Sequence, residues 1–474
     1  MRIPVVLLFF ASLFACGVIA GPAEGMLAAW KPDVSEGEPV PENMVRSHEE
    51  AAMKTPVALF RSDAVSWALN LGGDAYTDIG GVAYLPDPDL PGGEVGRIAK
   101  ALGAQDATVY ETFRQGEFQL SHAVDNGFYD LTFQFAEPEE IEPGERVFDV
   151  LVQGMTVIEG LDVKTARDGN SGFALDRTVT GIEVKDGKLE IGFIARAGKP
   201  LLNGLVVRRR EPDMRQWIPG WSDEFSVEGP PDSAVWVIEK WSPGKVNRED
   251  QAYTDRRKNL RVEDGRLVIE AHREEFEGAR YTSGRLHTLN KRDMLYGRVD
   301  IRARLPAGRG TWAALWMLPS DPFRYATTCS LDGEWQGNED CDAWPNSGEI
   351  DIMEHVGFDM PRVHGTVHNR AYFPGNSQQR KGSVEVRDVE STFQVYSLEW
   401  TPEFIRTFIN GSPYFTYYNE GHGWEAWPYD HPYHLIFNLA IGGTWGGAGG
   451  PIDDSIFPVR MEVDYVRYFT PGAE

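Results

Sequence analysis

The stretch Gly348-Glu-Ile-Asp-Ile-Met-Glu354 threads three carboxylates through β-branched and apolar residues, which is the composition of a buried strand. Side chains alternate between the two faces of a strand, so Glu349 and Asp351 share a face while Glu354 comes one residue late. A β-bulge, which adds one residue, would return Glu354 to that face. Three adjacent carboxyl groups raise at least one pKa, as a carboxyl general acid requires at neutral pH. The alternation fits an ordinary solvated acidic strand equally well.

Tryptophans surround this stretch in the sequence. Trp344 lies just upstream, Trp312 and Trp316 belong to an earlier apolar segment, and Trp445 follows a pair of glycines. Because the faces of indole rings stack on the apolar faces of sugars, tryptophans beside paired carboxylates indicate a carbohydrate cleft. The surroundings therefore favour a cleft over a solvated strand.

Seven motifs, the acidic stretch among them, occur in the order typical of one enzyme family. They occupy residues 221–225, 247–254, 281–285, 310–312, 348–354, 438–445 and 464–467. On these motifs the region 217–470 resembles a family 16 glycoside hydrolase of the laminarinase-like branch. The resemblance implies a β-jelly roll, in which two curved sheets form a sandwich with the cleft on the concave face. Abundant glycine and proline, with 12% aromatic residues, independently favour an all-β fold.

The resemblance also assigns roles to the acidic residues. It implies that Glu349 is the nucleophile and Glu354 the general acid/base of a retaining mechanism, which needs the two carboxyl groups about 5–5.5 Å apart. Asp351 lies between them and is expected to hydrogen-bond the nucleophile and to tune both proton affinities. We expect no cofactor for catalysis.

Residues that match binding positions of the family are expected to line the cleft. The donor side is assigned to three polar residues and sugar stacking to three indoles: Asn247, Glu249 and Arg285, and Trp312, Trp316 and Trp445. His368, on the next expected strand, is assigned to substrate near the acid/base, although a hydrogen-bonded structural histidine fits as well. The resemblance also implies a structural calcium ion on the convex face, with oxygen ligands from Glu224, Gly265 and Asp464.

The region 57–210 is a separate β-rich unit. Residues 146–150 and 187–193 alternate between apolar and polar side chains, which favours half-buried strands of a smaller sandwich. Its motifs at 67–73, 135–137 and 202–207 resemble a malectin-like carbohydrate-binding domain. That resemblance implies sugar contacts from loop aromatics, although each of them fits a core position equally well: Tyr76, Tyr84, Tyr110 or Phe113.

Size and charge narrow the classes of partner. The 474 residues allow two or three domains with sizeable cores. A formal net charge of −26 disfavours nucleic acid and anionic membrane surfaces, so a neutral polysaccharide is the expected partner. We expect a monomer without a membrane-spanning segment in the mature chain.

The N-terminus indicates export. Met1 and Arg2 precede an apolar run, and a small-residue cleavage site precedes Gly21, so residues 1–20 are the expected signal peptide and residues 21–56 a tether. A lipoprotein signal ending at Cys16 is the alternative. In a secreted or periplasmic protein, Cys329 and Cys341 are expected to form a disulfide, with two free thiols as the alternative.

Together these expectations describe a secreted, retaining endo-β-1,3-glucanase acting on laminarin-like glucans, and on mixed-linkage β-1,3-1,4-glucans as an extension. One alternative is an agarase- or carrageenase-like galactan hydrolase of the same fold. A second alternative is a non-catalytic β-glucan-binding protein, but such relatives lose one or both glutamates of the acidic stretch, and both are present here.

Overall fold

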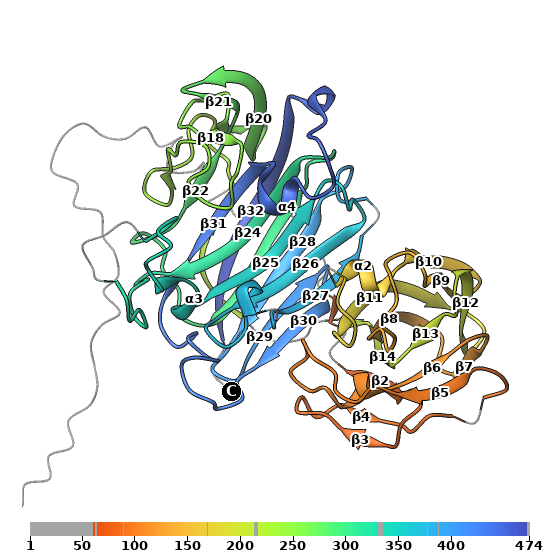
Figure 1. The fold of residues 1–474 in the computed structure, drawn as a ribbon. Helices are drawn as coiled ribbons and strands as arrows, with labels where there is room; N and C mark the ends of the chain where they lie inside the picture. Colours follow the sequence, from red (N-terminus) through yellow and green to blue (C-terminus); the bar gives the residue numbers. More distant parts are fainter. Residues whose placement is uncertain are drawn as a thin grey trace, which may run out of the picture. The chain divides into compact units, whose positions relative to one another are not determined.

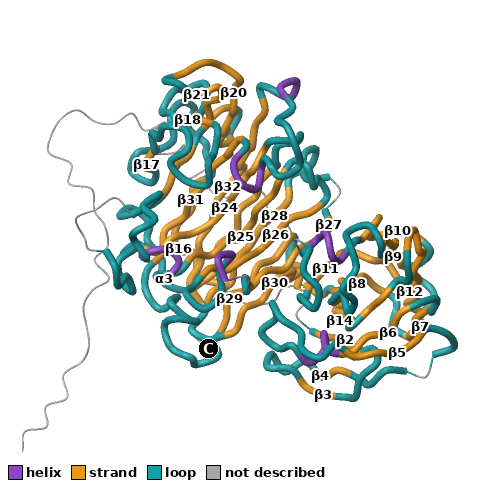
Figure 2. Tube along the Cα trace, viewed as in Figure 1, coloured by secondary structure: helices purple, strands orange, loops and turns teal. Residues whose placement is uncertain are grey.

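The computed structural model describes residues 60–61, 64–88, 90–167, 169–212, 217–329, 335–376, 378–386 and 388–471 (Figure 1). The expected signal peptide, the tether and Cys16 lie outside these residues. Strands dominate the described chain and the helices are single short turns, which confirms the all-β prediction (Figure 2). None of the helices in the described part has the length and apolar character needed to cross a membrane.

The C-terminal region forms two large sheets. In spatial order, the first sheet contains β17 (Val237–Ile238), β22 (Arg285–His287), β31 (Tyr433–Ile441), β24 (Thr311–Pro319), β25 (Glu349–Val356), β26 (Arg362–His368) and β27 (Arg380–Glu385). The second sheet contains β18 (Gln251–Tyr253), β21 (Ala279–Ser283), β20 (Arg266–Phe276), β32 (Val459–Pro471), β23 (Gly297–Arg304), β28 (Gln394–Trp400), β29 (Phe404–Ile409) and β30 (Ser412–Tyr418). Two further strands join the second sheet: β16 (Trp217–Asp223) pairs with β32, and β19 (Leu260–Glu263) pairs with β20.

One apolar core lies between these two sheets. Ile350 and Ile352 of β25 belong to the same buried cluster as Ile301 of β23 and Val463 of β32, and all four side chains are fully buried. Because one face of β25 packs into this core, the carboxylates of the acidic stretch are left on the opposite face. The short elements α3 (Ala343–Asn346), α4 (Gly443–Gly446), Pro374–Asn376 and Asp454–Ile456 lie in the connections.

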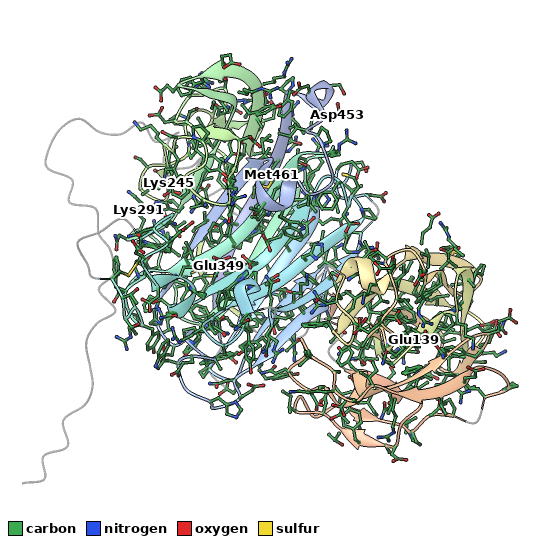
Figure 3. All side chains as sticks on the ribbon, in the orientation of Figure 1. Glu139, Lys245, Lys291, Glu349, Asp453 and Met461 are labelled. Atoms are coloured by element: carbon green, nitrogen blue, oxygen red, sulfur yellow. A yellow bond between two sulfur atoms is a disulfide. The ribbon has the colours of Figure 1, made fainter. Side chains whose placement is uncertain are left out.

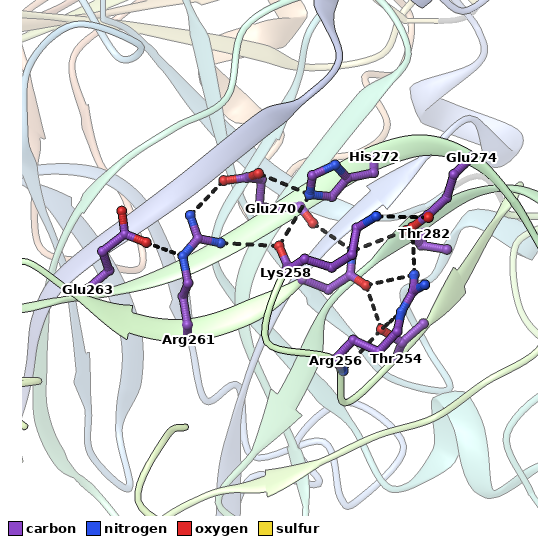
Figure 4. Close-up of polar contacts among 10 residues, drawn as sticks. Thr254, Arg256, Lys258, Arg261, Glu263, Glu270, His272, Glu274 and Thr282 are labelled. Atoms are coloured by element: carbon purple, nitrogen blue, oxygen red, sulfur yellow. Dashed lines mark hydrogen bonds and ion pairs between the residues drawn. The ribbon is translucent and has the colours of Figure 1, made fainter. Parts of the chain in front are cut away.

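A polar network holds the segment that follows β18 against the second sheet (Figure 4). The carboxylate of Glu274 on β20 accepts hydrogen bonds from Arg256, Lys258 and Thr282. Arg261 on β19 pairs with Glu270 on β20 in the same way. These contacts fix the end of the chain segment that carries the expected donor-side residues.

The N-terminal unit has its own sheets and core. Its strands are β2 (Val65–Asn70), β14 (Gly204–Arg209), β8 (Gly127–Phe135) and β11 (Leu175–Val184); β10 (Met155–Leu161), β9 (Val147–Val152), β12 (Lys188–Ala197) and β7 (Gln119–Ala123); β13 (Leu201–Leu202), β6 (Thr112–Gln115) and β5 (Glu94–Arg97); β3 (Tyr76–Thr77) and β4 (Ala83–Tyr84); β1 (Phe60–Arg61) and β15 (Glu211–Pro212). Its turns include α2 (Val163–Ala166) and Thr108–Glu111. Phe133, Phe135, Phe148 and Leu205 lie fully buried in its core. Its strand β11 also pairs with β27, where Thr178 lies opposite Val384.

Candidate active site

The acidic stretch is strand β25 and contains the predicted bulge (Figure 3, where Glu349 is labelled). On one side Asp351 pairs with Trp316 and Met353 with Leu315 of β24, so the register shifts by one residue at Ile352. On the other side Asp351 and Glu354 pair with Thr366 and His364 of β26, across the same shift. The inserted residue returns Glu354 to the face of Asp351, and the prediction of a bulge is confirmed.

Gly348 explains how the chain enters this strand. Its φ is +90°, and a Cβ atom there would lie 2.2 Å from the hydroxyl of Tyr433. Both the backbone conformation and the lack of space therefore require glycine immediately before Glu349.

The three carboxyl groups of β25 are buried together. Asp351 is 2% exposed, Glu354 is 9% exposed and the side chain of Glu349 is 16% exposed. Burial raises the pKa of Glu349 and of Asp351 well above the ordinary value, and the negative charge of a neighbouring carboxylate adds to the effect. Burial also raises the pKa of Glu354, against the opposing influence of His368. This is not a solvated strand face, so at neutral pH the cluster keeps protons that isolated carboxyl groups would lose.

Each glutamate of the cluster accepts a hydrogen bond from an indole. Nε1 of Trp344 donates to Oε2 of Glu349 over 2.9 Å, and Nε1 of Trp312 donates to Oε1 of Glu354 over 3.1 Å. Trp312 therefore orients a carboxyl group, in addition to the stacking role predicted for it, which stays a prediction. The sequence placed Trp344 near the site but gave no indication that its N–H group points at Glu349.

His368 joins the same cluster. Its Nε2 atom lies 3.0 Å from Oδ2 of Asp351 and 3.5 Å from Oε1 of Glu349, and the residue is 6% exposed. Within the described residues, Glu349, Asp351 and His368 are the one set of acidic and histidine ligand atoms close enough to share a metal ion. The short contacts are those of a hydrogen-bonded chain, so His368 positions the carboxyl groups; contact with substrate stays a prediction.

A hydrogen-bond chain brings the expected donor-side residues together. Glu249 is 7% exposed and accepts hydrogen bonds from Nδ2 of Asn247 at 3.2 Å and from the hydroxyl of Tyr253 at 3.2 Å. Nδ2 of Asn438 donates to that hydroxyl, and its Oδ1 accepts from Nε1 of Trp316 at 2.7 Å. Tyr253 and Asn438 lie inside the motifs at 247–254 and 438–445, but sequence reasoning did not assign them to the site.

Arg285 is buried among aromatic rings and is 3% exposed. Its Nε atom pairs with Glu239, and its guanidinium lies 4.3 Å from the ring centre of Trp241 and 4.9 Å from that of Trp316. Cation–π contacts of this kind fix the two indoles. Arg285 therefore positions two aromatic side chains, while its predicted contact with substrate stays a prediction. Glu239 and Trp241 were missed because no motif marks them.

Trp445, on α4, contacts two other rings of the site. Its ring centre lies 5.6 Å from that of Trp312 and 5.0 Å from that of His364, edge to face in both cases. Its predicted stacking on sugar stays a prediction, and His364 was not assigned to the site from the sequence.

The loop before β25 carries the predicted disulfide. Cys329 and Cys341 are joined by an S–S bond of 2.02 Å, which confirms the pairing. The next residue, Asp342, accepts hydrogen bonds from the backbone N–H groups of Thr327 and Thr328. Together these contacts anchor the segment that presents Trp344 to Glu349.

The expected calcium ligands are engaged with arginines. The carboxylate of Glu224 accepts two hydrogen bonds from Arg467, at 2.8 and 2.9 Å, and that of Asp464 accepts one from Arg302 at 2.6 Å. Gly265 lies in the turn between β19 and β20. Because guanidinium groups already neutralise both carboxylates, this set does not fit a calcium ion.

Three of the four aromatic residues singled out in the N-terminal unit line a cavity of about 150 Å³. Tyr76 stacks on Tyr84 with ring centres 4.8 Å apart, and the hydroxyl of Tyr110 donates to Oδ1 of Asp176, which shares the cavity. Phe113 is 6% exposed and belongs to the buried apolar residues. Sugar binding by this unit stays a prediction.

Known proteins resemble both regions of the chain. The model of glycosyl hydrolases family 16 matches residues 247–467, and the model of the malectin domain matches residues 65–206. A β-glucanase from Rhodothermus marinus is 47% identical over 259 residues, which span 53% of this chain and 85% of that protein. A glucan endo-1,3-β-glucosidase from Cryptopygus antarcticus is 33% identical over 276 residues, spanning 54% of this chain and 92% of that protein. The X-ray structure of the laminarinase from Rhodothermus marinus aligns with a TM-score of 0.50 at 46% identity, over 55% of this chain and 100% of that one.

Proposed function

The chain belongs to family 16 of the glycosyl hydrolases, with a malectin domain before the catalytic domain, and we propose that it hydrolyses internal β-1,3 bonds of laminarin-like glucans with retention of configuration. The observation that carries the proposal is the bulged strand β25, on which three buried carboxyl groups share one face and both glutamates accept an indole N–H. We propose further that the protein acts as an exported monomer.

The two glutamates divide the first chemical step between them. Glu349 attacks the anomeric carbon as a carboxylate, because Trp344 donates a hydrogen bond to it and His368 lies 3.5 Å away, and both stabilise the ionised form. Glu354 donates a proton to the glycosidic oxygen as the bond to the leaving sugar breaks, and its burial keeps it protonated beyond the ordinary range of glutamate. The product of this step is a covalent glycosyl-enzyme on Glu349.

The second step reverses the proton transfer. Glu354, now ionised, takes a proton from water, and the resulting hydroxide attacks the anomeric carbon and releases Glu349. Asp351 shares a hydrogen bond with Glu349 and lies 3.0 Å from His368, so it can compensate the change in charge at the nucleophile. The chemistry is complete with carboxyl groups and water, and we propose that it uses no cofactor.

The substrate is proposed to be a neutral β-glucan. The family shared with a β-glucanase and an endo-1,3-β-glucosidase supports this, as does the net charge of −26, which disfavours sulfated or uronic polymers. Mixed-linkage β-1,3-1,4-glucan is proposed as a second substrate.

A substrate panel tests the proposal. The purified protein should release reducing sugar from laminarin and, more slowly, from lichenan, and should release none from agarose or carrageenan. Release from a galactan alone would establish the agarase- or carrageenase-like alternative. Binding of laminarin without release from any of the four polymers would establish a glucan-binding protein.

A further inference from the structure

Three rings enclose the carboxyl group of Glu354. Trp312 on β24 donates a hydrogen bond to it, and His364 on β26 lies directly opposite it in the strand register. Trp445 on α4 contacts both of these rings, at 5.6 Å and 5.0 Å between centres. The strands on both sides of β25 therefore each contribute one ring, and the third ring joins them.

His364 takes part in this enclosure as an uncharged ring. It is half-buried, and its Nε2 atom is buried without a hydrogen-bond partner. Burial, together with the positive charge of Lys381, lowers the pKa of His364 well below the ordinary value of histidine. An imidazole in this state adds no positive charge beside Glu354, and its ring is available for packing against Trp445.

We infer that His364 is a positioning residue for the general acid: its ring holds Trp445 against Trp312 and closes the β26 side of Glu354 to water. The inference rests on the proposed function, because it concerns the acid/base of that reaction. It differs from the role proposed for His368, which contacts Asp351 and Glu349 directly.

The groups that face Glu354 define what the enclosure has to do. Negative charge comes from its own strand, partial or full positive charge from β26 and β27, and a phenol faces the cluster from β30: Glu349 and Asp351, His368 and Lys381, and Tyr414. His364 is itself faced by Lys381, Arg177, Arg362 and His355. The largest influence on Glu354 is burial, which favours the protonated acid, while His368, Trp312 and Lys381 favour the anion. Removing the ring of His364 admits water and leaves the influences that favour the anion in place.

Substitution of His364 tests this inference through the pH profile. In His364→Ala, the pKa of the acid should fall, so the basic limb of kcat/KM on laminarin should move down by about one pH unit, with a roughly tenfold loss above that limb. On an aryl β-glycoside with a good leaving group the loss should stay below about threefold, because that reaction needs little protonation. His364→Phe keeps a flat ring and should retain the wild-type limb. His364→Gln has no ring and should behave like His364→Ala.

His355→Ala provides the matched control. His355 is the residue after Glu354 on β25, is fully buried, and bonds the carbonyl oxygen of Met360, so it points away from the enclosure. This variant should lower Tm without moving the basic limb.

Three outcomes would overturn the inference. An unmoved limb in His364→Ala would exclude the role, and so would a loss in His364→Phe as large as in His364→Ala, since it would assign the effect to the ring nitrogen. If His364→Ala and His364→Gln fail to fold by circular dichroism, a shifted limb in folded His364→Phe would exclude it as well. Failure of the wild type on laminarin would refute the proposed substrate instead, and the same variants would then be compared on the polymer that the wild type cleaves.

Discussion

The hydrogen bond from Trp344 to Glu349 makes the ionisation of the nucleophile measurable. In Trp344→Phe the donor is lost, while a flat ring remains beside His368 and Phe373, whose ring centres lie 5.6 Å and 6.0 Å from that of Trp344. The N–H group stabilises the carboxylate of Glu349 and not the protonated acid. Its removal should therefore raise the pKa of Glu349 and move the acidic limb of kcat/KM to higher pH.

The size of the shift follows from the strength of the bond. Hydrogen bonds to charged groups contribute about 1.5–3 kcal/mol net, and about 1.4 kcal/mol corresponds to one pKa unit. Trp344 is 36% exposed, so water competes for the carboxylate and the lower end of that range applies. We expect the acidic limb to rise by about one pH unit, with a loss of roughly tenfold in kcat/KM below the limb.

The assay is the initial rate on laminarin as a function of pH, with Trp221→Phe as the matched control. Trp221 lies on β16 of the second sheet, and its indole nitrogen is buried without a hydrogen-bond partner. The control should keep the wild-type profile. An acidic limb in Trp344→Phe that coincides with that of the wild type would refute the stabilisation of Glu349 by Trp344.

Three further predictions follow from the same structure. In the folded state burial raises the pKa of Asp351, so its contribution to stability is complete below about pH 4 and is lost as the pH rises; Asp351→Asn should have a higher Tm than the wild type at pH 8 and an equal one near pH 4, and a difference independent of pH would contradict the linkage. A chain starting near Met214 should keep its turnover on soluble laminarin, because the aligned laminarinase spans only the C-terminal region; a folded but inactive product would show that the malectin domain is needed. EDTA should change Tm by less than about 1 °C, since Glu224 and Asp464 are paired with Arg467 and Arg302; a fall of several degrees reversed by calcium would reveal a metal site.

The sequence was sufficient to predict strand β25 and its bulge, because the alternation of side chains is a local property with a period of two residues. A carboxylate one residue out of phase can share a face with the others only if a residue is inserted, and the register shift at Ile352 is that insertion. The disulfide was predicted for a similar reason: Cys329 and Cys341 are separated by 12 residues and belong to one loop.

The directions of side chains could not be predicted from the motifs. Whether Trp312 offers its ring face or its N–H group depends on neighbouring strands, and Trp344 reaches Glu349 only because the disulfide loop presents it there. Asn438 and Tyr253 lie 185 residues apart in sequence, so their hydrogen bond depends on the packing of the two sheets. His364 acquires its place from its register opposite Glu354, which no composition or spacing reveals.

The most direct test of the central claim is the configuration of the products formed with azide by the two glutamate variants. In Glu354→Ala, an activated aryl β-glycoside should still form the glycosyl-enzyme on Glu349, and azide should attack it to give the β-glycosyl azide. In Glu349→Ala, any azide product should be the α-anomer, formed by direct displacement. NMR of the anomeric proton distinguishes the two. The β-azide from Glu354→Ala would establish Glu349 as the nucleophile and Glu354 as the acid/base, whereas an α-azide from Glu354→Ala, or inversion by the wild type, would contradict the assignment.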